Sequence, residues 1–132
     1  MKPNLATMSV ITGMFLTGMP VAAHHSLEGS YVMNQRVTVE GDLVQFLYRN
    51  PHSFVTIKGK NPTTGDLVMW SVEWNGAKRL GREGVTPNTL KLGDHVVAVG
   101  QPSRNPEHHR LYMETITRPS DKWEWHRAHR FD

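Results

Sequence analysis

The sequence predicts a small all-β domain: a five-stranded barrel with a short helix between its third and fourth strands. The chain has 132 residues, the usual size of a single domain. Its 11 glycines and 8 prolines favour many short elements over a few long helices. Five segments carry the apolar pattern of strands, and the one helical segment lies between the third and the fourth of them.

The first predicted strand, residues 36–48, is long and bent. Valines alternate with polar residues at its start, and Gly41 interrupts this alternation. A glycine inside a strand often marks a bulge or a sharp bend. A small closed barrel needs a long, bent first strand of this kind, and Asn50 and Pro51 end it.

The other predicted strands are short apolar runs bounded by turn residues: residues 53–58, 67–74, 95–100 and 110–117. A short helix is expected over residues 75–83, followed by a single turn that Thr86 caps and Pro87 opens. A helix between the third and fourth strands is the arrangement of the OB-fold, a five-stranded Greek-key barrel. The predicted fold is therefore an OB-like barrel, with a looser five-stranded sandwich as the alternative.

Residues 1–23 are expected to form a cleaved secretory signal peptide. Lys2 precedes an apolar stretch over residues 8–19, and small residues lead to a cleavage position after Ala23. This stretch is too short to span a membrane as a helix, which needs about 20 apolar residues. We therefore expect a bacterial protein in the periplasm or outside the cell, without a membrane span after cleavage. An uncleaved membrane anchor is the alternative.

The mature chain is expected to comprise a barrel domain, residues 24–118, and a polar, aromatic tail, residues 119–132. The tail carries Trp123 and Trp125. Two tryptophans left wholly in water would be unusual, because each has a large apolar surface. They are expected to fold back over the barrel or to dock on a partner protein.

Charge and composition argue against several functional classes. The 15 Lys and Arg residues exceed the 12 Asp and Glu residues only slightly, without a clustered basic stripe, so we expect no nucleic-acid binding. The absence of cysteine excludes disulfides, cysteine-ligated zinc, iron–sulfur clusters and thiol catalysis. The sequence has no nucleophile-elbow motif and no phosphate-binding loop, so we expect no enzymatic activity and no cofactor.

Four motifs occur together in this chain: His24-His25-Ser26, Asn50-Pro51-His52, Trp70-Ser71-Val72-Glu73 and residues 90–96, before the fourth strand. With them, the chain resembles a family of small secreted bacterial proteins of unknown function, over nearly the whole mature chain. The resemblance implies a periplasmic, OB-like barrel, and it implies no catalytic or binding residues. The chain departs from this family at Leu27, where the resemblance leads us to expect an aromatic residue.

One face of the third predicted strand is the candidate ligand-binding surface. Trp70 and Trp74 share this face, and the ligand-binding surface of OB barrels includes the second and third strands. A tryptophan there can stack on a base, a sugar or a peptide side chain, although the same face is also suited to fill the barrel. We expect a non-enzymatic binding or accessory module, and its candidate site comprises Arg49, His52, Lys58, Lys60, Trp70 and Trp74.

The alternative function is copper binding in the periplasm. The chain has eight histidines, and cleavage after Ala23 would make His24 the first residue of the mature protein. The α-amine and imidazole of His24 can chelate one ion together. A second imidazole, from His25 or His52, would complete a three-nitrogen site that suits Cu(II). A structural role for His52, donating a hydrogen bond to a loop carbonyl, is the simpler interpretation of that residue.

Overall fold

The first strand, β1 (Val37–Leu47), is the long strand that the sequence predicts, and a register shift interrupts its pairing between Leu43 and Gln45. The computed structural model describes residues 27–128. Gly41 lies so close to β2 (His52–Lys60) that a Cβ atom at this position would overlap the backbone of β2. β1 pairs antiparallel with β4 (His95–Pro102) over its first half and with β2 over its second half. One bent strand therefore belongs to two walls of the barrel.

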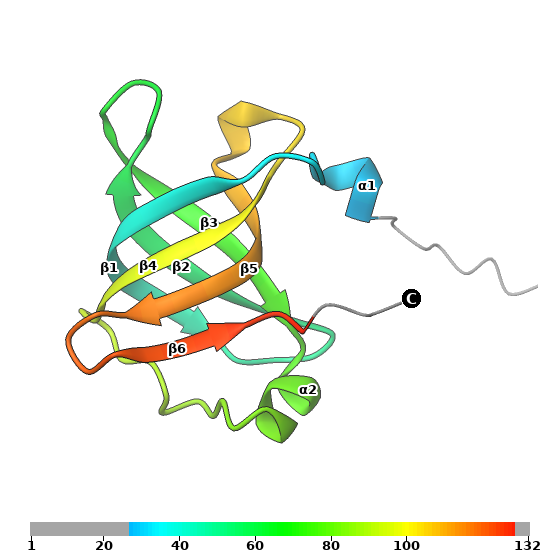
Figure 1. Ribbon diagram of the computed structural model, residues 1–132, viewed down its shortest axis with the longest axis vertical. Coiled ribbons are helices and arrows are strands. Elements are labelled where there is room, and N and C mark those ends of the chain that lie inside the picture. The colour runs from blue at the N-terminus through cyan, green and yellow to red at the C-terminus, as the bar shows by residue number, and fades with distance from the viewer. Residues whose placement is uncertain (1–26, 129–132) are drawn as a thin grey trace, which may run out of the picture.

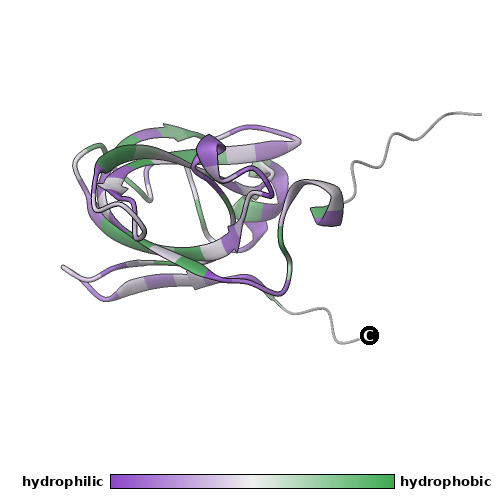
Figure 2. Ribbon diagram, turned by 90° about the horizontal axis from the view of Figure 1, so that it is seen from above, coloured by the Kyte–Doolittle hydropathy of each residue, from purple (hydrophilic) through white to green (hydrophobic). Residues whose placement is uncertain are grey.

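Parallel pairing between β3 (Leu67–Asn75) and β5 (Arg110–Arg118) closes the barrel (Figure 1). β2 pairs with β3, and β4 pairs with β5, both antiparallel, so the order around the barrel is β1-β2-β3-β5-β4. The short helix α2 (Ala77–Arg82) lies between β3 and β4 in the chain. The predicted all-β, OB-like five-stranded barrel is thereby confirmed, and Figure 2 looks down on its ring of strands.

The interior of the barrel is filled by one side of each barrel strand. In β3, Trp70, Val72 and Trp74 have exposed fractions of only 6%, 0% and 1%. Both tryptophans therefore belong to the hydrophobic core, which is one of the two roles that the alternation in β3 predicts. The other core side chains are Val39, Leu43, Val55, Ile57, Leu80, Val85, Leu90, Val96, Ala98, Leu111, Met113, Ile116 and Trp125.

A sixth strand, β6 (Trp123–His126), lies outside the closed barrel and within the predicted tail. The start of β5 pairs with β3, and the end of β5 pairs with β6. The ring of Trp125 meets that of Trp74 with 5.1 Å between centroids, and Trp125 Nε1 donates to Glu83 Oε2 at 2.8 Å. β6 thus continues the wall of the barrel where β3 no longer pairs with β5.

Two short helical segments complete the fold. They are α1 (Leu27–Ser30), before β1, and the 3-10 helix η1 (Pro106–His108), between β4 and β5. The sequence predicts an extended segment where α1 forms, but a hydrogen bond from Tyr31 N to Leu27 O at 2.8 Å closes one helical turn there.

None of the helices within residues 27–128 has the length and apolar character that a membrane span requires. The predicted signal peptide lies outside the described residues.

On the outer face of the β1–β4 pair, His95 lies between two carboxylates. Its Nδ1 is 2.9 Å from Asp42 Oδ1, and its Nε2 is 3.0 Å from Glu40 Oε1. The hydrogen bond to Glu40, followed by the one to Asp42, raises the pKa of His95 above its usual value. The protonated imidazole is therefore the form that stabilises the folded protein.

A His95→Gln variant is expected to lose a pH-dependent contribution to stability. Because the folded-state pKa is raised, this contribution is complete below the unfolded-state pKa of about 6.5 and disappears as the pH rises through the folded-state pKa. We expect this contribution to the free energy of unfolding to be less than about 1 kcal/mol, since the side chains of His95, Glu40 and Asp42 are all more than half exposed to solvent. Urea unfolding between about pH 5.5 and 9 measures it. A stability advantage of the wild type that grows with pH would contradict the assignment.

Candidate functional site

A cavity of about 650 Å³ opens at one end of the barrel. Three segments surround it: the lead-in to β1, the β2–β3 loop and the β4–β5 loop, and both loops stand at the top of the barrel in Figure 1. The apolar part of its lining consists of Val32, Val37, Pro62, Trp70, Pro102 and Pro106. Its volume lies within the range of about 300–1,000 Å³ that is usual for small-molecule sites.

Trp70 and His109 provide the aromatic surface of this cavity. Their ring centroids lie 5.3 Å apart with an interplanar angle of 67°, which is an edge-on contact. His109 has a φ of 43°, a left-handed conformation that costs a non-glycine residue about 1–2 kcal/mol. Two contacts hold it there: His109 Nε2 is 3.3 Å from Asn61 Nδ2, and His109 O accepts from Ser71 N at 3.0 Å. The β4–β5 loop is thereby fastened to β3 and to the β2–β3 loop.

Two buried N–H groups of cavity-lining residues have no hydrogen-bond partner within residues 27–128. They are Nε1 of Trp70 and Nε of Arg110. An unpaired buried donor costs about 1–3 kcal/mol. Such donors are rare in native proteins, and each one needs an explanation. Both atoms are almost fully covered by protein, so a ligand in the cavity would pair with them only after the side chains move.

Arg110 also joins this cavity to a polar cluster on the outer face of β3. The cluster is centred on Glu73, which is only 9% exposed. The Tyr31 hydroxyl donates to Glu73 Oε2, and Arg110 Nη2 lies 3.3 Å from the same oxygen. His52 Nδ1 lies 3.0 Å from Glu73 Oε1. Burial raises the pKa of Tyr31, and Glu73 raises it further, so the hydroxyl keeps its proton and remains a donor.

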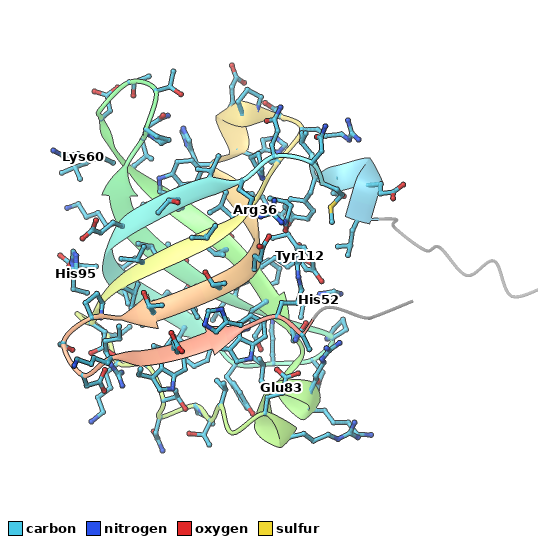
Figure 3. All side chains as sticks on the ribbon, viewed as in Figure 1. Arg36, His52, Lys60, Glu83, His95 and Tyr112 are labelled. Carbon is cyan, nitrogen blue, oxygen red and sulfur yellow. The ribbon has the colours of Figure 1, made fainter. Side chains whose placement is uncertain are left out.

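The predicted ligand-binding residues of β2 and the turn before it do not form one site. His52 begins β2 and Arg49 lies in the turn before it, where the Arg49 guanidinium carbon is 5.5 Å from the centroid of the Phe54 ring. Lys58 and Lys60 lie at its other end. His52 and Lys60 are about 26 Å apart along the strand, at about 3.3 Å per residue. Figure 3 accordingly shows them on opposite sides of the barrel.

The two tryptophans of β3 have different surroundings. Trp70 lines the cavity at the end of the barrel, whereas Trp74 lies in the core between Phe46 and Trp125. Trp74 Nε1 is also buried without a partner among the described residues, but Trp74 does not line the cavity. Of the predicted stacking pair, Trp70 alone is therefore placed to meet a ligand in the cavity.

The geometry around His52 bears on the predicted copper site. His52 Nδ1 is held by the carboxylate of Glu73 instead of a loop carbonyl, and Nε2 has no partner among the described residues. A carboxylate behind an imidazole is a common arrangement around bound metals. However, no group of three or more histidine, aspartate or glutamate side chains within residues 27–128 is arranged to hold a metal ion. His24 and His25 lie outside the described residues, so copper binding stays a prediction.

Sequence reasoning missed four residues of the site: Tyr31, Glu73, His109 and Arg110. The sequence does contain one indication of Glu73, because this residue is the only charged one in the apolar run of β3. A buried carboxylate needs hydrogen-bond donors, but its sequence position does not show which ones it has. The donors Tyr31 and Arg110 are 42 and 37 residues away in the chain.

Comparison with known proteins adds one finding. A family of unknown function (DUF6152) matches residues 13–112, which is about three quarters of the chain. This match agrees with the expectation of a family without an assigned function. No curated protein matches the chain, and no solved structure matches it.

Proposed function

Because the chain belongs to this family of unknown function, its role has to be inferred from the barrel itself, and we propose that the protein is a non-enzymatic binding module. Its ligand is a small, largely apolar molecule that carries a hydrogen-bond acceptor, and the cavity at the end of the barrel is its site. We expect the module to act in the periplasm or outside the cell, as the apolar residues 8–19 indicate.

The observation that carries this proposal is the lining of the cavity, which combines apolar side chains around Trp70 with the guanidinium groups of Arg104 and Arg110. An apolar concave surface with a few convergent polar groups is the usual form of a small-molecule site. The surrounding loops are fastened to the barrel through His109, so the site is formed before a ligand arrives. A preformed site lowers the ordering cost of binding.

The charges of the lining favour a carboxylate as the acceptor group. Two guanidinium groups line the cavity: Arg110 is paired with Glu73, whereas Arg104 has no ion pair within residues 27–128, and Glu107 is the only carboxylate among the described lining residues. Guanidinium groups bind carboxylates through short, charge-assisted hydrogen bonds. A flat aromatic ring would pack against Trp70. The ligand class is therefore a small aromatic or apolar carboxylic acid.

Calorimetric titration with 2-naphthoate tests the proposal, because this probe combines an aromatic ring system with one carboxylate. We expect a dissociation constant on the order of 100 μM, which is usual for a ligand of this size. The neutral analogue 2-naphthylmethanol is expected to bind at least about tenfold more weakly, because it lacks the charge-assisted hydrogen bonds.

A matched pair of variants locates the binding. Thr63 is exposed and lines the cavity, so Thr63→Trp is expected to fill the site and to abolish binding of 2-naphthoate. Thr38 is an exposed residue of β1 outside this lining, so Thr38→Trp is expected to bind as the wild type does. Circular dichroism checks that both variants are folded. Undiminished binding by folded Thr63→Trp would refute the assigned site.

A further inference from the structure

A second pocket lies beside α2, and we propose that it binds a small dianionic oxyanion, such as a phosphate group. The pocket has a volume of about 310 Å³, and residues at the start of β2, the end of β3 and α2 line it. It shares no lining residue with the cavity at the end of the barrel. It is therefore a separate site, and the inference does not depend on the proposed function.

The lining of this pocket is cationic. Lys78, Arg79 and Arg82 contribute three positive charges, and no residue of the described lining is a carboxylate. Arg79 is already paired, since its Nε lies 2.9 Å from Glu83 Oε1. Lys78 and Arg82 have no ion pair within residues 27–128. Two unpaired positive charges therefore remain, and they match the charge of one dianion.

The spacing of these two cations strengthens the argument. Lys78 and Arg82 are four residues apart in α2, so their side chains lie next to each other on one face of the helix. Like charges at this spacing destabilise a helix by about 0.2–0.5 kcal/mol. A bound dianion would convert this repulsion into two attractive contacts. Both residues are exposed, so an ion from solution can reach them.

Neutral groups of the pocket complete the site. Asn75 lines it, and the Nδ2 donor of Asn75 is buried without a partner among the described residues. Asn50 Oδ1 accepts a hydrogen bond from Lys78 N at 3.1 Å, which fixes the start of α2 to the turn before β2. The imidazole of His52 is held in place by Glu73. These contacts hold the wall of the pocket in place, and the exposed side chains of Lys78 and Arg82 are the groups that reach an oxyanion.

The size of the pocket limits the ligand class. The pocket has about half the volume of the cavity at the end of the barrel, about 310 Å³ against about 650 Å³. That is enough for a phosphate group with a small organic substituent. The pocket's two unpaired cations do not form the long basic stripe that a polyanionic chain needs. The ligand is therefore a small, soluble phosphate compound or the free ion.

Titration with inorganic phosphate, at constant ionic strength set by sodium chloride, tests this proposal. The double variant Lys78→Gln/Arg82→Gln is expected to bind phosphate at least about tenfold more weakly than the wild type, because both unpaired charges are removed. The control Lys58→Gln/Lys60→Gln removes the same charge from the far end of β2. The dissociation constant of this control for phosphate is expected to stay within about twofold of the wild-type value, since exposed distant charges are screened by salt.

Each outcome of this experiment decides the proposal. Equal weakening in the two double variants would show a general charge effect and overturn the site. Undiminished binding by Lys78→Gln/Arg82→Gln, or no binding by the wild type at about 10 mM phosphate, would also overturn it. The Thr63→Trp variant is expected to bind phosphate as the wild type does. A failure of the cavity proposal is therefore distinguishable from a failure of this one.

Discussion

Replacing Trp125 with alanine is expected to lower the free energy of unfolding by about 3–5 kcal/mol, the usual cost of removing a buried aromatic side chain. Trp125 is only 6% exposed, and its ring packs edge-on against Trp74 at an interplanar angle of 74°. Its Nε1 also donates to Glu83 Oε2. β6 has four residues, so its pairing with β5 depends strongly on this one side chain.

Trp123 provides the matched control in the same strand. It is half-buried and packs under Arg118, whose guanidinium carbon lies 5.6 Å from its ring centroid. We expect Trp123→Ala to cost about 1 kcal/mol. Equilibrium unfolding in urea compares the two variants. A loss below about 1 kcal/mol for Trp125→Ala would contradict the structural role of β6. It would favour the alternative that Trp125 is free to dock on a partner.

The second large effect is expected at Glu73, where Glu73→Gln should lower the free energy of unfolding by about 1–3 kcal/mol. Glutamine keeps the shape of the side chain but removes the charge that Arg110 and His52 contact. Its amide nitrogen would also face donors, because Tyr31, His52 and Arg110 all present N–H or O–H groups there. The variant therefore leaves buried donors without a full set of acceptors.

A double-mutant cycle with Tyr31→Phe tests whether the effect of Glu73→Gln comes from its contacts in this cluster or from the general loss of one charge. Because the Tyr31 hydroxyl donates directly to Glu73, the coupling energy is expected to exceed about 0.5 kcal/mol. The control is Glu124→Gln, since the Glu124 side chain is 63% exposed, and it should change stability by less than about 0.5 kcal/mol. Strict additivity of Glu73→Gln and Tyr31→Phe would show that the two groups do not interact in solution.

The sequence predicted the barrel well because its strands have strong local signals. Alternating and apolar runs indicated β1 to β5, and Gly41 lies where β1 pairs with both β2 and β4, whereas the register shift of β1 lies between Leu43 and Gln45. β6 was missed because it has four residues and two of them are charged or polar. Its main stabilising contact, between Trp125 and Trp74, joins residues far apart in the chain. Local pattern carries no information about such a contact.

The candidate site was harder to predict for the same physical reason. Alternation in β3 placed Trp70 and Trp74 on one face, but it did not distinguish the end of the barrel from its middle. His109 and Arg110 follow a loop whose path depends on a left-handed residue, and the sequence offers no signal for that conformation at a histidine. Lys78 and Arg82 lie in the short helix that the sequence predicts over residues 75–83, but neither this cation pair nor the pocket beside it was predicted.

Locating 2-naphthoate on the protein by nuclear magnetic resonance tests the binding-module proposal most directly. In isotope-labelled protein, the proposal predicts that the largest shift changes fall on residues 61–64 and 103–110 and on the indole N–H of Trp70, which surround the cavity. Residues 75–82, beside the second pocket, should respond to phosphate instead. Shift changes from 2-naphthoate that are confined to residues 75–82, or absent throughout the titration, would contradict the assignment of the cavity at the end of the barrel as the ligand-binding site.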